Sequence, residues 1–520
     1  MKWLGLPKRV IFEFFENERI VIGIIILLAV FLRFFHLHEL PADTFGDMVE
    51  NIEHVQAVRN GTWRLIYGFD GREGLFFYLA AASSFLLGNT YFNLKFVTAT
   101  AGILTVLFSY LFVRQIAHRS VALITAFLIA TSKWALVYSR IGFRTVLTPL
   151  FVSIVLFFFF RAIKTRRQTD VVCGAFFLGL GLYTYTAFKF VIISVFLMSL
   201  ILMFMKKKQI KRMIPSATVA VLIFTLLTVP QIIDMSRSPN DYLSHPGPMI
   251  LVEGKIPTDW WQKVLINTIH QFGMFTVKGD AVSRINPPYE PALDSITGIF
   301  FLIGFAVVAF FKRKKEIILL LIPFVVVQLS SILVINFPND VPSATRTTGI
   351  LPVVFFFSAL GLDFARTRIK SFWMRRSWLG VILIGILFLN MYSYFYRYPQ
   401  FLPNRNVAFD RVISHYFDQQ NENTAIYLVG GAWGDAGQPH PRAILYSMRS
   451  KHPVRIVSEN VESDVCPLLD LKSQKDFFVV INPHLTQLPS EECFRGAHLK
   501  IIKTESGDDV CIVISSLPIE

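Results

Sequence analysis

Long uninterrupted runs of apolar residues constrain the fold of this chain more than any other feature. A helix of about 20 residues crosses the hydrocarbon core of a bilayer, so an apolar run of roughly 18 residues indicates a membrane span. We count about eleven such runs. They lie near residues 20–35, 92–113, 121–138, 146–160, 171–185, 190–205, 214–233, 295–311, 317–335, 349–364 and 378–396.

The composition agrees with a membrane protein. Hydrophobic residues make up 53% of the 520 residues and charged residues 17%, whereas soluble domains contain roughly 25% charged residues. This composition excludes a disordered chain, a collagen-like fibre and a disulfide-stabilised scaffold. It also argues against an ordinary cytosolic enzyme.

The excess of positive charge is a topology signal. The chain carries 51 Lys and Arg against 36 Asp and Glu, a net charge of +15. Its basic clusters fall in alternate loops, near residues 114–119, 161–167, 206–212, 312–315 and 366–376. Short loops rich in Lys and Arg stay in the cytoplasm, so we expect the N-terminus inside and the C-terminus outside. This placement accounts for the charge, and we expect no nucleic-acid partner.

The long segments lie on the opposite face. Residues 37–74, 234–294 and 336–348 would all be outside, together with everything after Arg397. The working parts of the protein are therefore expected there. The apolar run Leu75–Leu87 is short for a span, and we expect a helix that lies at the membrane interface or dips into it.

Residues 401–520 have a different character from the rest of the chain. Short β-like runs alternate with helix-like stretches, a pattern typical of a small α/β domain. We therefore expect a membrane domain of residues 1–400 and an extracytoplasmic domain of residues 401–520. Cys173 lies in an apolar run, whereas Cys466, Cys493 and Cys511 lie in the tail. Three cysteines allow at most one intramolecular disulfide, and the sequence leaves the pair open.

Two carboxylates stand out in the first outer segment. Asp47 follows the first apolar run closely, and Glu73 lies just ahead of the short apolar helix. A carboxylate at this boundary can act as a general base towards a hydroxyl at the interface. Each also suits a helix start, Asp47 as a cap and Glu73 as a charge at the helix N-terminus. The residues alone leave both interpretations open.

Cations also stand at the outer ends of the apolar runs, where the orientation rule disfavours them. Arg140 and Arg144 are four residues apart and share a helix face if the turn between them stays helical. Lys189, Arg284 and Arg346 lie in three other outer segments. A converging set of cations suits an anionic phosphate, which guanidinium groups bind with two hydrogen bonds. Snorkelling towards lipid headgroups is the alternative that remains open.

Four motifs occur in order along the membrane region. They are Ser132–Arg144, Gly179–Lys189, Gly279–Asp294 and Pro342–Pro352. Together they resemble motifs of the membrane glycosyltransferases of the GT-C fold. The chain is most similar to the bacterial and archaeal relatives of the dolichyl-phosphate-mannose–protein mannosyltransferases and of the aminoarabinose transferases. The resemblance covers roughly residues 21–396 and implies an α-helical polytopic membrane protein of GT-C type.

The resemblance also implies a function. It predicts an inverting glycosyltransferase of the cell membrane that moves a sugar from a polyprenyl-phosphate donor to an acceptor hydroxyl on the outer face. Asp47 would be the general base and Glu73 a second acid. No cofactor is required, and no metal site is indicated. The expected ligands of the donor phosphate are Arg140, Arg144, Lys189, Arg284 and Arg346, and the expected substrate contacts are Tyr185, Asp280 and Asn286.

Some positions depart from the pattern of the family. Met48 stands where many relatives have Glu, Ile285 where a His is usual, Lys189 where an Arg is usual and Lys133 where a Pro is usual. The sugar stays open, as does the acceptor, which is a protein, a lipid or a glycan. A lipid-linked-sugar transporter is the main alternative, although it would need polar sites near the midplane and usually internal repeats. An O-antigen ligase or polymerase and an inactive relative that only binds are further alternatives.

Overall fold

The computed structural model describes residues 17–42, 45–68, 71–205, 210–243, 249–251, 255–310, 315–429, 439–457, 476–481 and 496–518. The chain divides into two compact units. The first unit comprises Met1–Leu37, Val55–Gly88 and Phe92–Tyr398, and the second comprises His38–His54, Asn89–Tyr91 and Pro399–Glu520. The expected division at residue 400 stays a prediction.

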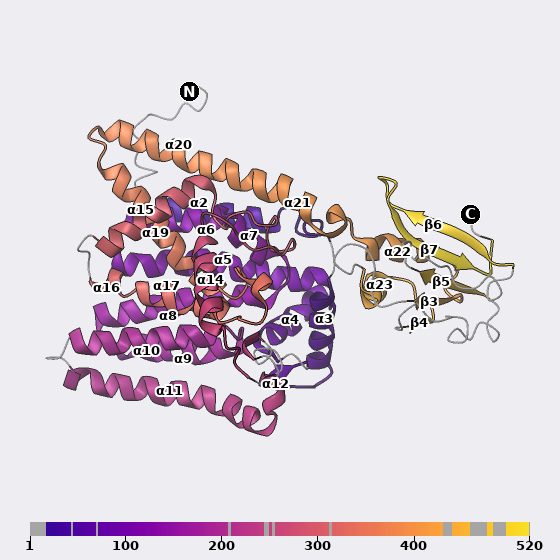
Figure 1. Cartoon of the computed structure of the whole chain (residues 1–520), viewed down its shortest axis with the longest axis horizontal. Coiled ribbons are helices and arrows are strands. Elements are labelled where there is room, and N and C mark those ends of the chain that lie inside the picture. The colour runs from indigo at the N-terminus through magenta and orange to yellow at the C-terminus, as the bar shows by residue number, and fades with distance from the viewer. Residues whose placement is uncertain are drawn as a thin grey trace. The chain divides into compact units, whose positions relative to one another are not determined.

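Helices dominate the first unit (Figure 1). Its helices are α2 (Glu18–Phe34), α4 (Leu75–Leu87), α6 (Arg119–Thr131), α7 (Lys133–Arg140), α8 (Leu147–Thr165), α9 (Gln168–Leu180), α10 (Phe188–Met205), α11 (Ile210–Arg237), α12 (Pro239–Leu243), α14 (Trp260–Gly273), α15 (Ser295–Phe310), α16 (Lys315–Ile318), α17 (Leu321–Val326), α18 (Leu329–Ile332), α19 (Leu351–Thr367) and α20 (Phe372–Met391). Three helices contain residues of both units: α3 (Gly46–Arg59), α5 (Tyr91–Ile116) and α21 (Tyr398–Phe401).

The apolar runs predict these helices well. Among the described residues, seven helices are long and apolar enough to cross a membrane, or up to eight if the bent pair α6–α7 is one span. Each of the runs named above lies on a helix or on consecutive helices, and Leu75–Leu87 forms the expected short helix α4. The count of about eleven spans and their orientation stay predictions.

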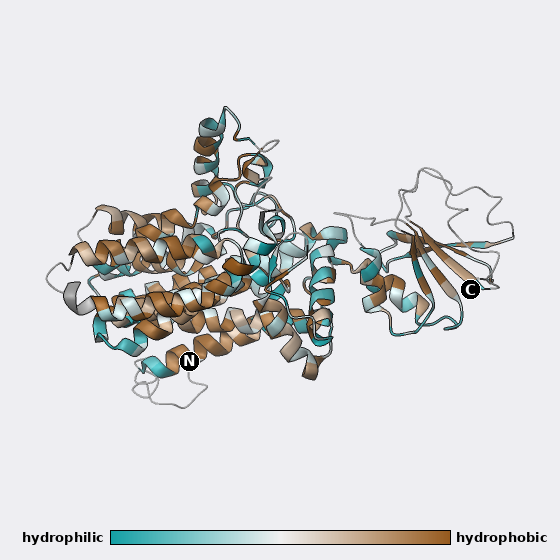
Figure 2. Cartoon of the chain, turned by 90° about the horizontal axis from the view of Figure 1, so that it is seen from below, coloured by the Kyte–Doolittle hydropathy of each residue, from teal (hydrophilic) through white to brown (hydrophobic). Residues whose placement is uncertain are grey.

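Close helix crossings and apolar outer faces characterise this unit. A Cβ atom on Gly304 of α15 would lie 1.8 Å from the carbonyl oxygen of Phe357 in α19, so only glycine allows this approach. Small residues at helix crossings are typical of membrane bundles. Helix α9 packs between α8 and α11. Figure 2 shows hydrophobic residues along most of these helices, with hydrophilic residues gathered towards their ends.

The C-terminal part of the second unit is a mixed sheet with two helices. Among the described residues its strands are β3 (Ala425–Val429), β4 (Val454–Val457), β5 (Phe477–Ile481), β6 (His498–Lys503) and β7 (Asp509–Ser515), in the order β4-β3-β5-β7-β6. Strand β3 is parallel to β4 and β5, whereas β7 is antiparallel to β5 and β6.

The helices α22 (Phe409–Phe417) and α23 (Pro441–Ser447) cover one face of this sheet. Alternate residues of β3 point to opposite faces: Ile426 joins the core beneath the helices, and Tyr427 joins the core of the other face. The predicted small α/β domain is therefore confirmed, because period-two patterning places one apolar set on each face.

Candidate active site

A buried ion pair lies where the first outer segment meets the end of α7. Strands β1 (Ile66–Tyr67) and β2 (Arg72–Glu73) form a short antiparallel ribbon that places Glu73 directly before α4. Arg144 opens a 3₁₀ turn between α7 and α8. Arg144 Nε lies 3.6 Å from Glu73 Oε2, and the two side chains are only 6% and 3% exposed.

Each side chain of this ion pair has an atom that is able to form a further hydrogen bond. Neither Arg144 Nε nor Glu73 Oε2 has a hydrogen-bond partner in the part of the chain that the structure describes. Burial raises the pKa of Glu73, and the Arg144 charge opposes that rise. Buried polar atoms almost always find a partner, so the pair is suited to receive a further polar group.

Tyr185 and Lys189 lie beside the ion pair. The Arg144 guanidinium lies over the Tyr185 ring, with Cζ 5.4 Å from the ring centroid. Lys189, in the first turn of α10, is close enough to Glu73 to lower its pKa electrostatically. Four of the residues expected at the site therefore come together, and we call Glu73, Arg144, Tyr185 and Lys189 the Glu73 cluster.

Asp280 and Asn286 shape the loop ahead of α15. Asp280 is buried, and its carboxylate accepts hydrogen bonds from the backbone N–H groups of Val282 (2.9 Å) and Ala344 (2.8 Å). Burial raises the pKa of Asp280, and these two N–H groups oppose the rise. Asn286 Nδ2 donates to the carbonyl oxygens of Asp280 (3.3 Å) and Glu290 (2.6 Å). These bonds give both side chains a role in holding loops together, and their expected contact with substrate stays a prediction.

Arg346 and Arg284 occupy two neighbouring outer segments. Arg346 Nη2 lies 3.3 Å from Asp340 Oδ2, and the arginine side chain is 14% exposed. Its charge also acts on Asp280. Arg284 is half-buried, and its backbone carbonyl accepts a hydrogen bond from the Tyr398 hydroxyl. The expected phosphate contacts of these two arginines stay predictions.

Tyr138 connects these outer loops to the Glu73 cluster. Its hydroxyl lies 2.9 Å from Thr345 Oγ1, next to Arg346. Asp280 and Tyr185 both lie close enough to act on this hydroxyl electrostatically. Three segments that are distant in the sequence therefore meet around one buried tyrosine.

Arg140 has backbone partners instead of a place in the Glu73 cluster. Its buried guanidinium donates to the carbonyl oxygens of Leu32 (2.7 Å), Arg33 (3.0 Å) and Phe35 (2.7 Å). These carbonyls lie at the C-terminal end of α2, where helical acceptors lack partners and a cation complements the helix dipole. The hydrogen bonds favour a scaffold role, and the expected role as a phosphate ligand stays an untested prediction.

The expectation that Arg140 and Arg144 share a helix face is wrong. Helix α7 ends at Arg140, and Gly142 has a φ of +71°. A positive φ interrupts the right-handed helix, and glycine adopts it without steric cost. The two arginines therefore belong to different elements and contact different partners.

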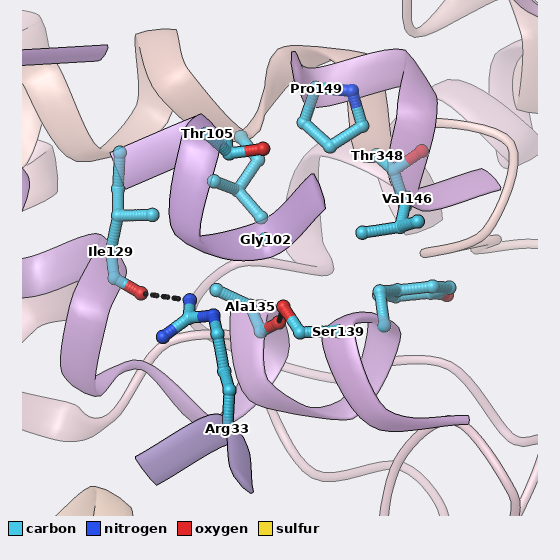
Figure 3. A pocket seen from close by; sticks show the side chains of 11 residues that line it. Arg33, Gly102, Thr105, Ile129, Ala135, Ser139, Val146, Pro149 and Thr348 are labelled. Atoms are coloured by element: carbon cyan, nitrogen blue, oxygen red, sulfur yellow. Dashed lines mark hydrogen bonds between the residues drawn. The ribbon is translucent and has the colours of Figure 1, made fainter. Parts of the chain in front are cut away.

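A small cavity lies beside Arg33 near the C-terminal end of α2 (Figure 3). The Arg33 guanidinium donates to the carbonyl oxygens of Ala130 (3.1 Å) and Ile129 (3.3 Å). The cavity has a volume of about 10 Å³ and is also lined by Gly102 and Ser139. Such a space holds about one water molecule, so it is no site for a sugar or a lipid phosphate.

Two groups of polar contacts in the first unit were not predicted from the sequence. Lys133 Nζ lies 3.1 Å from Glu290 Oε2, and Arg397 Nη1 lies 2.6 Å from Glu290 Oε1. Tyr242 donates to Asp234 Oδ2 at 2.9 Å, and the charge of Glu73 acts electrostatically on the Tyr242 hydroxyl. Only Lys133 gave a signal in the sequence, as a cation where relatives have Pro.

Asp47 belongs to the second unit. It is half-buried in the first turn of α3. This position suits a carboxylate because the helix N-terminus carries partial positive charge. Its expected role as the general base stays a prediction.

The described residues also bear on the expected absence of a metal site and on the cysteines. Across the described ranges, no three His, Cys, Asp or Glu side chains are grouped as metal ligands would be. Cys511 is buried and free, and Cys173 is free. Cys466 and Cys493 lie outside the described residues, so the expected disulfide stays open.

Comparisons with known proteins agree with this architecture. Residues 75–233 match the profile of the family described as dolichyl-phosphate-mannose-protein mannosyltransferase. A comparison with curated proteins gave no match.

Solved structures resemble the chain over most of its length. One is ArnT from Cupriavidus metallidurans bound to undecaprenyl phosphate, with a TM-score of 0.56 and 13% identity over 95% of this chain and 98% of that one. Another is the oligosaccharyltransferase AglB from Archaeoglobus fulgidus in complex with an inhibitory peptide and a dolichol-phosphate. It has a TM-score of 0.51 and 14% identity over 89% of this chain and 69% of that one. The predicted fold class is thereby confirmed: the chain has the GT-C fold of membrane glycosyltransferases.

Proposed function

We propose that this protein transfers a sugar from a polyprenyl-phosphate donor to an acceptor hydroxyl on the outer face of the cell membrane, with inversion at the anomeric carbon. The observation that carries the proposal is the Glu73 cluster, in which the buried Arg144 pairs with the buried Glu73 and the exposed Lys189 adds a second cation. The two solved relatives support the donor class, since one was determined with undecaprenyl phosphate and the other with a dolichol-phosphate.

The phosphate of the donor binds to Arg144 and Lys189 in this proposal. Arg144 Nε is buried with no hydrogen-bond partner among the described residues, so a phosphate oxygen would satisfy it. Cations held in a buried site stabilise the charge that develops on a leaving phosphate much more than they would in water. Arg346 is the next candidate. Arg140 is assigned to the scaffold because both its Nη1 and its Nη2 donate to carbonyl oxygens at the C-terminal end of α2.

The reaction needs a base for the acceptor. Asp47 takes the proton of the acceptor hydroxyl while its oxygen forms a bond to the anomeric carbon. The bond from that carbon to the phosphate oxygen breaks at the same time, and its electron pair stays with the polyprenyl phosphate. Positioning and charge neutralisation supply most of the rate, because phosphate is a competent leaving group.

Transfer from synthetic donors tests the proposal. The purified protein is given a panel of polyprenyl-phosphate sugars with candidate acceptors, with and without chelator, and released polyprenyl phosphate is measured. Asp47→Asn is expected to abolish transfer while donor binding persists, and Arg144→Ala is expected to weaken donor binding first.

Matched variants serve as controls. Glu50→Gln changes a carboxylate one turn further along α3. Arg161→Ala removes an arginine that also pairs with a carboxylate (Asp170, 3.2 Å) and lies over an aromatic ring, but in the last turns of α8. Both controls should keep transfer. Movement of lipid-linked sugar across a bilayer without transfer would instead support the transporter alternative and refute the proposal.

A further inference from the structure

Asn406 ties the first outer segment to the start of the C-terminal α/β domain. Its Oδ1 accepts a hydrogen bond from the backbone N–H of Ala42 at 2.7 Å, and its Nδ2 donates to the carbonyl oxygen of Glu39 at 3.1 Å. Arg411 of α22 adds a hydrogen bond to the carbonyl oxygen of His38 at 3.2 Å. Backbone groups outside regular structure need such partners, and here two side chains of the domain supply them.

The turn that presents Asn406 has an unusual backbone. Asn404, Arg405 and Asn406 have φ angles of +52°, +52° and +66°. Residues with side chains rarely enter this left-handed region, and rarely in succession. Such a conformation persists where the surrounding contacts over-determine it, and it is often found at functional sites. The double hydrogen bond of Asn406 is a contact of this kind.

A second attachment lies on the other side of Asp47 in the sequence. Arg442 Nη1 of α23 lies 2.9 Å from Oε1 and 3.0 Å from Oε2 of Glu53 in α3. Asn89 Nδ2 donates to the carbonyl oxygen of Ile52 at 3.1 Å. The two attachments therefore bracket Asp47 along the chain.

Helix α23 also lies against the residue that precedes Asp47. A Cβ atom on Gly46 would lie 3.8 Å from Cδ2 of His440, so the imidazole lies close to the backbone at this residue. His440 caps α23 by accepting a hydrogen bond from the N–H of Arg442 at 3.3 Å. The residues at the start of α23 therefore lie close to Gly46, through His440, and bind Glu53, through Arg442.

We propose that the C-terminal α/β domain positions the segment that carries Asp47, with Asn406 and Arg442 as positioning residues. The inference rests on the proposed function, in which Asp47 is the general base. In this inference the domain affects catalysis by fixing the position of Asp47, because a small misplacement of a catalytic group lowers the rate strongly.

The test measures local opening and transfer separately. Hydrogen exchange of the amides of residues 45–54 is followed in the full chain in detergent. Asn406→Gly removes the side-chain bridge, while glycine still accepts the positive φ. We expect exchange to be roughly tenfold faster, since two hydrogen bonds are lost. Arg405→Gly is the matched control, because Arg405 has the same φ and an exposed side chain, and its exchange should stay unchanged.

The ion pair is tested by exchanging its charges. Arg442→Glu should speed exchange of the same amides, and the swapped pair Glu53→Arg with Arg442→Glu should slow it again. Arg455→Ala, which changes an exposed arginine on β4, should have no effect. A rescue by charge exchange is not expected if Arg442 merely stabilises the fold of its own domain.

Transfer kinetics complete the test. Asn406→Gly should lower kcat roughly ten- to hundredfold and leave the KM of the donor lipid nearly unchanged. Unchanged exchange in both Asn406→Gly and Arg442→Glu would overturn the inference, as would faster exchange with unchanged kcat. A fully active Asp47→Asn would overturn the proposed base instead, and the two failures are distinguishable because the exchange measurement does not depend on transfer.

Discussion

Replacing Glu73 by Gln leaves the Arg144 guanidinium buried without its counter-charge. Arg144 Nε and Glu73 Oε2 lie 3.6 Å apart. With an effective dielectric constant of about 20, the Coulomb attraction is 332/(20 × 3.6), or about 5 kcal/mol. Burial raises the pKa of Glu73 in spite of this attraction, so the cost of removing water from its carboxylate is the larger effect. We therefore expect the neutral Glu73→Gln variant to unfold at an equal or higher temperature in detergent at neutral pH.

The same substitution should strengthen the response to the donor lipid. In the proposed function, the carboxylate of Glu73 and the donor phosphate compete for the Arg144 guanidinium. Without the carboxylate, a phosphate regains part of the lost attraction, and each 1.4 kcal/mol regained corresponds to about a tenfold gain in affinity. Undecaprenyl phosphate is therefore expected to raise the unfolding temperature of Glu73→Gln more than that of the unaltered protein.

Thermal unfolding with and without undecaprenyl phosphate measures both effects. The double variant Glu73→Gln with Arg144→Met should respond little to the lipid, because the guanidinium is gone. Asp170→Asn breaks the Arg161–Asp170 pair (3.2 Å) at the other end of α8 and should lower stability without changing the lipid response. An equal lipid-induced shift in the unaltered protein and in Glu73→Gln would refute phosphate binding at Arg144.

Three further predictions concern charge and packing. Because burial raises the pKa of Glu73 above its usual 4.5, its contribution to folding is fully present below pH 4.5 and is lost as the pH rises through the raised pKa. Over the same pH range the affinity of the unaltered protein for undecaprenyl phosphate should fall relative to the affinity of the Glu73→Gln variant. Binding titrations from about pH 5 to 8 measure both affinities, and a constant ratio between them would contradict this prediction. Asp280→Asn replaces one carboxylate oxygen, an acceptor, with an amide NH₂ group that cannot accept from the backbone N–H it faces. This should cost about 1–3 kcal/mol of stability in thermal unfolding, with Asp259→Asn as a control because the Asp259 side chain is 48% exposed. Gly304→Ala should cost about 1–3 kcal/mol because its Cβ would meet the Phe357 carbonyl, whereas Gly380→Ala, with nothing within 4 Å, should not destabilise the protein.

Local patterns in the sequence predicted the elements of this fold well. The apolar runs fall on helices because span length and hydropathy are properties of a continuous segment. The short β-like runs of residues 401–520 predicted a sheet, and Phe477–Ile481 is one of its strands. Their alternating residues fill two cores, and that period is also visible locally.

The partners of the charged residues were much less predictable. Arg140 and Arg144 have the spacing of a helical pair, yet the positive φ of Gly142 separates them. Lys133 pairs with Glu290, which is 157 positions away. A spacing rule describes neighbours on one element, whereas these contacts depend on which segments the bundle brings together.

In the second unit, contacts between segments distant in the sequence matter most for function. Residues 38–54 lie near the start of the chain, but their hydrogen bonds reach residues 364 to 389 positions further on. No pattern within residues 38–42 indicates that the tail will supply hydrogen-bond partners, since His38, Glu39 and Ala42 use only backbone groups in these contacts. Because the tail supplies the hydrogen-bond partners of these backbone groups, the tail and residues 38–54 belong to one structural unit. Variants in the tail should therefore be expected to change transfer even where they touch no substrate.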